Sequence, residues 1–216
     1  MNILTILNIS KVLKKINLVL ILIAMIMVIG TNALLHSVIL MLIAVVLLLI
    51  STLLDNYVEK YGRDFEFVSY DMRKNNSLDE TSQSMLKPRR ADKGSCAYDF
   101  YAPYTFTVKP NEQKMIWTDI KVYMLPNEAL FLDVRSSQGK VRIRLANTIG
   151  LIDSTYYNNI DNEGNIGILI ENNGSEDYTV KAGEKFCQGM FIKYLTTRTD
   201  KPANQKRLGG WGSSGK

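Results

Sequence analysis

Two long apolar runs near the start of the chain limit what it can fold into more than any other feature. Residues 16–29 are almost wholly apolar, and residues 33–54 are apolar again, with His36 and a few hydroxyl groups as polar exceptions. The intervening residues 30–32, Gly-Thr-Asn, are typical of a turn. Because the second run has about the 20 residues that a helix needs to cross a bilayer, we predict an α-helical transmembrane hairpin over residues 1–54.

Other interpretations of these runs remain open. The first run can be a signal peptide, since Lys11, Lys14 and Lys15 precede it, and the two runs can form one long kinked helix. A soluble hairpin is disfavoured because so few polar side chains leave no solvated face. Basic residues favour the cytoplasmic side of a membrane. A hairpin therefore predicts a membrane-anchored protein with the rest of the chain in the cytoplasm, whereas a single crossing places it outside.

The sequence changes character after residue 54. In residues 55–90 a strand-like alternation at 65–70 is followed by a polar stretch, and we expect a linker or juxtamembrane segment. Residues 91–195 contain short strand patterns separated by turn signals, which predict an all-β sandwich or jelly roll. The expected strands are at 106–108, 114–117, 120–123, 129–134, 141–145, 165–171, 178–180 and 186–194. Residues 196–216 lack apolar periodicity and are typical of a flexible tail.

Charge, cysteine and histidine content narrow the chemistry. The net charge of +5 suits a phosphate-bearing substrate or an anionic membrane surface. Cys96 and Cys187 are too few and too far apart for a disulfide framework or a zinc site, and we expect both to be small core residues in a reducing compartment. His36 is the only histidine and lies in an apolar run, so a general base elsewhere must be a carboxylate.

Asp153 is the best-placed carboxylate for that role. The pattern of residues 146–159 predicts a strand, a tight turn and a second strand, in which an apolar run at residues 149–152 delivers Asp153 onto a turn. Tyr156 follows three residues later. By residue type alone, an aspartate in this position is more often a turn former than a base.

Five short motifs in order resemble those of the trimeric dUTP pyrophosphatases (dUTPases). They are Ala97-Tyr98-Asp99-Phe100, Arg135-Ser136-Ser137, residues 147–159 around Gly150-Leu151-Ile152-Asp153, Gly183-Glu184-Lys185-Phe186-Cys187-Gln188, and Arg207 to Gly215. Each motif is a weak signal alone, but five in order from about residue 90 to 216 are specific. The resemblance implies a dUTPase-like β-sandwich, a homotrimer with shared active sites, and Mg²⁺-dependent hydrolysis of dUTP to dUMP and pyrophosphate.

The resemblance also implies a role for each motif in catalysis and phosphate binding. Asp153 is expected to activate the attacking water. Asp99 is expected to hold waters bound to a Mg²⁺ ion that is itself carried mainly by the phosphates. Phosphate contacts are expected from Arg135, Ser136, Ser137 and Gln188, and from Arg207, Gly212 and Ser213 in the tail.

Base and sugar recognition is assigned in the same way. Asn147 and the backbone of Gly150, Leu151 and Ile152 are expected to read the uracil edge, which cytosine does not match. Tyr156 is expected to pack against the sugar and leave no room for a 2′-hydroxyl. Trp211, where the family usually has phenylalanine, is expected to stack on the base, and the tail is expected to close over a neighbouring subunit's site.

Some features depart from the family pattern. Thr155 stands where a second acidic residue is frequent, loop 157–164 is longer than in many members, and Tyr157 has no assigned role. The apolar hairpin lies outside the pattern altogether. No nucleic-acid partner is expected.

Two alternative functions remain. A dCTP deaminase of the same fold requires a catalytic glutamate where Leu169 stands, although Glu171 is close by. A non-catalytic, membrane-tethered nucleotide sensor or regulator is the second alternative.

Overall fold

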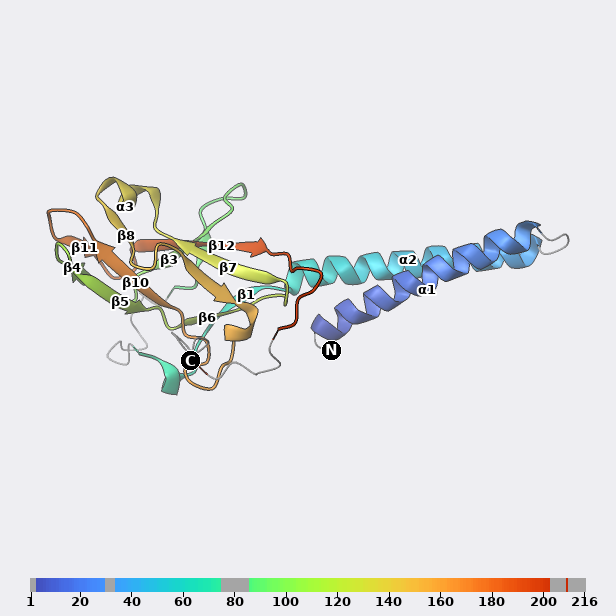
Figure 1. Cartoon of the computed structure of the whole chain (residues 1–216), viewed down its shortest axis with the longest axis horizontal. Helices are drawn as coiled ribbons and strands as arrows, with labels where there is room; N and C mark the ends of the chain where they lie inside the picture. Colours follow the sequence, from blue (N-terminus) through green and yellow to red (C-terminus); the bar gives the residue numbers. More distant parts are fainter. Residues whose placement is uncertain (1–2, 30–33, 75–85, 203–208, 210–216) are drawn as a thin grey trace. The chain divides into compact units, whose positions relative to one another are not determined.

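The computed structural model describes residues 3–29, 34–74, 86–202 and Gly209. The chain divides into a helical unit, Met1–Arg63, and a β unit, Asp64–Lys216 (Figure 1). In the helical unit, α1 (Ile3–Ile29) and α2 (Leu34–Tyr61) run side by side in opposite directions. The Ser10 hydroxyl donates to the Asp55 carboxylate at 2.6 Å, which joins the two helices near one end. One long kinked helix is therefore the wrong interpretation of the two runs.

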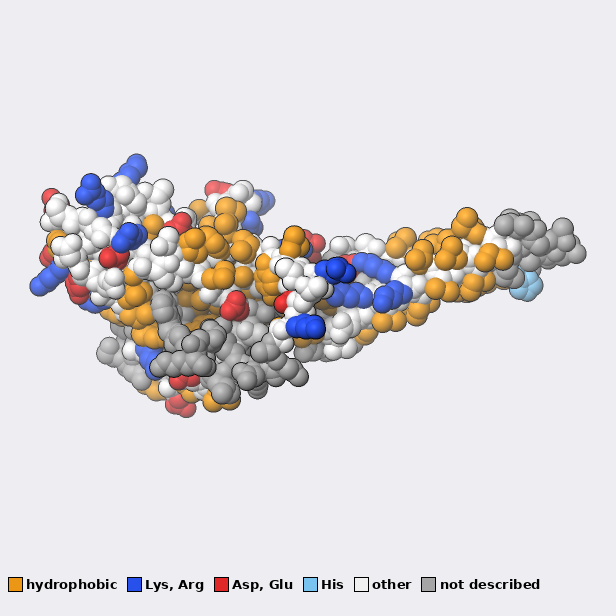
Figure 2. All heavy atoms as spheres, viewed as in Figure 1, with side chains coloured by type: hydrophobic (Ala, Val, Ile, Leu, Met, Phe, Trp, Pro, Cys, Tyr) orange, Lys and Arg blue, Asp and Glu red, His pale blue; other side chains and the backbone are white. Residues whose placement is uncertain are grey.

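Most of the buried side chains described on α1 and α2 are small or polar, with Ile6 and Val58 as the large apolar exceptions. Buried residues recur every seven positions: Ser10, Asn17 and Ala24 on α1, and Ser37, Ala44 and Ser51 on α2. Large apolar side chains cover the outside instead (Figure 2), and Leu18, Leu42 and Leu53 are each at least 60% exposed. A soluble helical pair buries its apolar stripe and exposes its polar face, so this pattern is the reverse of the soluble one.

Length and composition qualify one helix of the described residues as a membrane span. It is the stretch His36–Tyr61 of α2, which contains an 18-residue window with a mean hydropathy of 3.0. By this criterion, only α2 supports the expected hairpin of two crossings. The predicted turn at residues 30–32 lies in the part of the chain that the structure leaves undescribed.

The β unit contains twelve strands within the described residues. They are β1 (Asp64–Phe67), β2 (Arg89–Arg90), β3 (Tyr98–Tyr101), β4 (Phe106–Val108), β5 (Gln113–Trp117), β6 (Ile120–Tyr123), β7 (Glu128–Asp133), β8 (Ile143–Leu145), β9 (Gly150–Asp153), β10 (Gly167–Asn172), β11 (Tyr178–Val180) and β12 (Lys185–Lys193). A short helix, α3 (Ser136–Lys140), follows β7. The 3₁₀ turns η1 (Tyr70–Met72) and η2 (Ser154–Tyr156) follow β1 and β9.

These strands pair antiparallel around one apolar core. The largest sheet has the order β2-β3-β12-β7-β9, the next has the order β5-β10-β8, and β11-β4 and β1-β6 form two-stranded pairs. Phe100, Leu130, Ile170 and Phe186 come from different strands and are all fully buried in the same cluster. The predicted all-β architecture is confirmed for the described part of the unit.

Several local expectations need correction. The strand expected at 141–145 begins only at Ile143, because Arg142 has φ of 60°, a left-handed conformation that interrupts a strand. The helix α3 was not expected. Cys96 is exposed, whereas Cys187 is buried as expected. Residues 64–67 of the expected linker form β1, which pairs with β6 inside the β unit, and residues 75–84 lie among those not described.

The expected hairpin around Asp153 is also different. Within residues 146–159 only one strand forms, β9 (Gly150–Asp153), and the 3₁₀ turn η2 follows Asp153 in place of a second strand. β8 pairs with β10, whereas β9 pairs with β7 in the five-stranded sheet. The turn at residues 146–149 therefore carries the chain from one sheet to another.

Candidate active site

The five-stranded sheet brings three predicted site residues to one end of neighbouring strands. Gln188 on β12 lies opposite Asp99 on β3 and opposite Asp133 on β7. The chain reaches Arg135 two residues after Asp133, and the Arg135 Nε donates to Asp99 Oδ1 at 3.0 Å. Lys185 Nζ lies 2.8 Å from the other oxygen, Asp99 Oδ2.

Sequence reasoning missed Lys185 as a site residue. The signal was its place inside the fourth motif, three residues before Gln188. Its partner, Asp99, could be identified only from the pairing of β12 with β3.

The surroundings of Asp99 do not fit a protein-held magnesium ion. Asp99 is only 7% exposed, and both of its carboxylate oxygens form ion pairs with cationic side chains. Among the described residues, no three His, Cys, Asp or Glu side chains lie close enough together to hold a metal. A hard cation that keeps most of its waters and binds through substrate phosphates does not need such a group.

Hydrogen bonds fix the backbone that presents Arg135. The Arg135 N–H donates to Gln138 Oε1 at 2.8 Å, and Gln138 Nε2 donates to the carbonyl of Phe186 at 2.7 Å. Gln188 Nε2 donates to the carbonyl of Val134 at 3.0 Å. The corner between β7 and α3 is thus held from two sides, while Ser136 and Ser137 remain exposed to a ligand.

Asp153 lies away from this cluster in the same chain. It is exposed at the end of β9 and pairs with Ala129, four positions before Asp133 on β7. At about 3.3 Å per residue, this places it roughly 13 Å along the sheet from the level of Asp99 and Gln188. One chain therefore does not bring the predicted base to the predicted phosphate-binding residues.

The strand that carries Asp153 passes close to β7 and exposes apolar side chains. A Cβ atom at Gly150 would lie 2.8 Å from the Leu132 Cβ, so only glycine fits this crossing. Ile149 and Leu151 are 43% and 58% exposed, and Asn147 is exposed in the turn. Ile152 is half-buried against the core. Of the predicted base-reading residues, Asn147 and Leu151 are thus exposed, whereas Gly150 is buried and Ile152 is half-buried.

Tyr156 does not match its expected role in this conformation. Its ring is 4% exposed within the core cluster. Its hydroxyl donates to the carbonyl of Asn165 at 2.7 Å and accepts from Asn162 Nδ2 at 2.9 Å. The ring offers a ligand almost no surface, which is at odds with the expected contact with a sugar.

Tyr157, which had no assigned role, contacts the segment after the helical unit. Its hydroxyl donates to Glu66 Oε2 at 2.7 Å. Burial, followed by this hydrogen bond, raises the pKa of Tyr157 to about 12. The tyrosine therefore stays protonated, and keeps its donor, at neutral pH. The predicted tail residues Arg207, Trp211, Gly212 and Ser213 lie outside the described residues.

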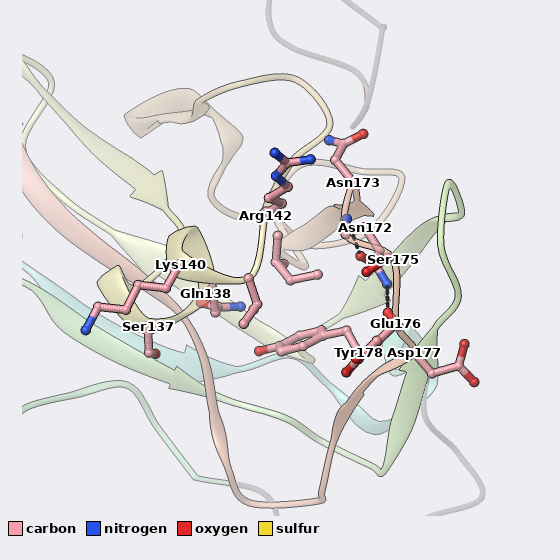
Figure 3. A pocket seen from close by; sticks show the side chains of 13 residues that line it. Ser137, Gln138, Lys140, Arg142, Asn172, Asn173, Ser175, Glu176, Asp177 and Tyr178 are labelled. Carbon is pink, nitrogen blue, oxygen red and sulfur yellow. Dashed lines mark hydrogen bonds between the residues drawn. The ribbon is translucent and has the colours of Figure 1, made fainter.

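A cavity of about 680 Å³ lies beside α3 and the turn between β10 and β11 (Figure 3). Of the predicted site residues, Ser137 is the one that lines it. The charged side chains Lys140, Arg142 and Asp177 point in different directions rather than toward a common ligand. The cavity therefore does not bring the predicted site residues together.

Comparisons with known proteins identify relatives of the β unit. A model of the dUTPase family matches residues 83–215. Deoxyuridine 5'-triphosphate nucleotidohydrolase of Lactococcus lactis subsp. lactis is 37% identical over 130 residues, covering 59% of this chain and 87% of that protein. The Swinepox virus protein of the same name is 32% identical over 138 residues, covering 62% and 92%. The solved structure of a Streptococcus mutans dUTPase aligns with a TM-score of 0.52 and 30% identity, covering 62% of this chain and 97% of that one.

Proposed function

The chain belongs to the dUTPase family, and we infer that it hydrolyses dUTP to dUMP and pyrophosphate. The reaction removes dUTP and supplies the precursor of dTMP. The observation that carries this function is the match of one family model over residues 83–215, a range that contains all five motifs. Relatives that match along most of their own length bear the name of this activity.

We propose that Asp153 orients and deprotonates the attacking water. Its carboxylate is exposed at a strand end, and the β unit contains no histidine that could replace it. Arg135, Ser136, Ser137 and Gln188 lie together and would contact the phosphates, with the magnesium ion arriving on the substrate. Asp99 keeps Arg135 and Lys185 in place through its two ion pairs.

We further propose that each site is completed by another copy of the chain in a homotrimer. The distance between Asp153 and the cluster around Asp99 supports this, because within one chain the predicted base lies far from the predicted phosphate-binding residues. The exposed apolar side chains of Ile149 and Leu151 flank Asp153 and are the kind of surface that a partner subunit buries. The tail, with Arg207, Trp211, Gly212 and Ser213, would close over a neighbour's site.

The alternative of a dCTP deaminase has little support in the structure. Glu171, the acidic side chain nearest the required position, is engaged in an ion pair with Arg144 at 2.7 Å. The test is the release of pyrophosphate and of ammonia by the purified chain with Mg²⁺ from dUTP, dCTP, dTTP and UTP. Release from dUTP alone is expected. Conversion of dCTP to dUTP would instead establish the deaminase, and binding without turnover would establish the sensor.

We also propose that the helical unit anchors the enzyme in a membrane as a hairpin. The reversed pattern of α1 and α2, with small residues between the helices and large apolar ones outside, is the pattern of helices packed in lipid. Lys11, Lys14 and Lys15 would lie at the cytoplasmic surface, and an even number of crossings returns the β unit to the cytoplasm, where dUTP is available.

The anchor predicts a definite result in sealed vesicles. The chain should stay in the membrane fraction after an alkaline carbonate wash. Added protease should digest the β unit in inside-out vesicles and leave it intact in right-side-out ones. Digestion in right-side-out vesicles would show a single crossing, and release into the wash would show that the chain is not embedded.

A further inference from the structure

The loop after η2 is built around Tyr156 by hydrogen bonds. Asn159 Nδ2 donates to the Tyr156 carbonyl at 2.9 Å and to Asn162 Oδ1 at 2.8 Å. Asn162 in turn donates to the Tyr156 hydroxyl, and that hydroxyl donates to the carbonyl of Asn165. The long loop, residues 157–165, thus encloses Tyr156 and fixes the end of the turn that begins at Asp153.

Glu163 connects this loop to the segment that leads out of the helical unit. Its Oε1 accepts from the Ser69 hydroxyl at 2.6 Å and its Oε2 accepts from the Ser69 N–H at 2.9 Å. Lys121 Nζ lies 3.3 Å from Oε2. The hydrogen bonds from Ser69 hold the pKa of Glu163 below its ordinary value, so the acceptor is ionised at neutral pH.

Further bonds join the same two segments. Tyr157 donates to Glu66, and Asn165 Nδ2 donates to the carbonyl of Met72 at 3.3 Å. Asp119 Oδ1 accepts from both Asn165 Nδ2 and the Lys74 N–H at 2.8 and 2.9 Å. Hydrogen bonds therefore connect residues 64–74 to loop 157–165 along most of their length. Since α2 ends at Tyr61 and β1 begins at Asp64, this is also the segment that follows the anchor directly.

We propose that Glu163 is a positioning residue, which clamps residues 64–74 to loop 157–165 and thereby holds the turn that presents Asp153. The clamp acts after Asp153 in the chain, whereas the predicted base-reading residues before it are held by the pairing of β9 with β7. Small misplacements of a reacting group reduce the rate far more than they reduce binding. Loss of the clamp therefore lowers kcat and leaves KM nearly unchanged. The proposal rests on the proposed function.

The test uses the full chain, four single variants and the double variant Glu163→Ala/Ser69→Ala. Glu163→Ala and Ser69→Ala remove either side of the clamp, and Ser69→Thr keeps the hydroxyl. Glu112→Ala is the matched control, because Glu112 accepts a backbone N–H from Lys109 at 2.7 Å in a turn between β4 and β5. The measured quantities are kcat and KM for dUTP at a temperature well below the midpoint of thermal unfolding of every variant.

We expect Glu163→Ala to lower kcat about tenfold with KM within about twofold, and Ser69→Ala to lower kcat in the same direction. The double variant should be no slower than Glu163→Ala, because the Ser69 hydroxyl has already lost its acceptor in that variant. Ser69→Thr and Glu112→Ala should match the wild type. If the wild-type chain is active and Glu163→Ala has the same kcat, the clamp is overturned. A loss of kcat in Glu112→Ala equal to that in Glu163→Ala would overturn it as well. An inactive wild-type chain would instead refute the proposed function.

Discussion

Replacing Asp153 with Asn is expected to lower kcat for dUTP hydrolysis by about 10²–10⁴-fold, the usual contribution of a general base. Asparagine has nearly the same shape but cannot accept the proton of the attacking water. Asp153 is exposed at the end of β9, so the substitution leaves the core intact. Affinity for dUTP should change little, because the phosphate-binding candidates lie elsewhere in the fold.

Asp177→Asn provides a matched control for this prediction. Asp177 is exposed in the turn between β10 and β11 and should retain wild-type kcat when substituted. The two variants are compared by initial rates of pyrophosphate release and by calorimetric titration with dUTP. An Asp153→Asn enzyme that keeps more than about a tenth of the wild-type kcat would show that another group activates the water.

Replacing Gly164 with Ala is expected to destabilise the β unit by roughly 2–4 kcal/mol, the sum of a left-handed backbone penalty and a steric clash. Gly164 has φ of 87°, and a Cβ atom there would lie 2.7 Å from the Tyr156 carbonyl oxygen and 3.2 Å from the Tyr157 Cα. Both neighbours are backbone atoms, so relief requires movement of the loop that holds the catalytic turn. Activity should fall as well.

Gly183→Ala separates the two contributions. Gly183 has φ of 78°, but no atom lies within 4 Å of the position that an added Cβ would take, so only the conformational penalty of about 1–2 kcal/mol applies. Urea unfolding followed by tryptophan fluorescence reports on the β unit, because both tryptophans, Trp117 and Trp211, belong to it. Equal destabilisation by the two substitutions would contradict the clash at Gly164.

Much of the β fold was predictable because its signals are local. Alternating apolar residues and turn signals located strands such as β4, β6 and β11 to the residue, since one face of each strand is buried. The start of β8 could not be predicted, because an arginine gives no local signal for the left-handed backbone that Arg142 adopts. Likewise, α3 has only five residues, too few to show a helical period.

The site was predictable as a set of motifs but not as a geometry. Motif order identified Asp99, Arg135 and Gln188, yet the partner Lys185 depends on which strands pair. The separation of Asp153 from them follows from the register of β9 on β7, which one sequence does not reveal. The burial of Tyr156 depends on a loop of asparagines whose hydrogen bonds have no periodic signature.

In the helical unit, apolar composition predicted the two helices but underestimated the length of the first. α1 begins at Ile3 rather than near residue 16, so Lys11 and Lys14 lie within the helix. Lys14 forms an ion pair with Asp55 of α2. A hydropathy profile treats such lysines as the end of an apolar run, although a paired charge continues the helix without a break.

Identification of the products formed from dUTP tests the central claim most directly. ³¹P NMR of the full chain incubated with dUTP and Mg²⁺ should show dUMP and pyrophosphate appearing in equal amounts. The Asp153→Asn variant under the same conditions should leave dUTP unchanged. Formation of dUDP and inorganic phosphate, or no turnover by a folded wild-type chain that binds dUTP, would contradict a dUTP pyrophosphatase.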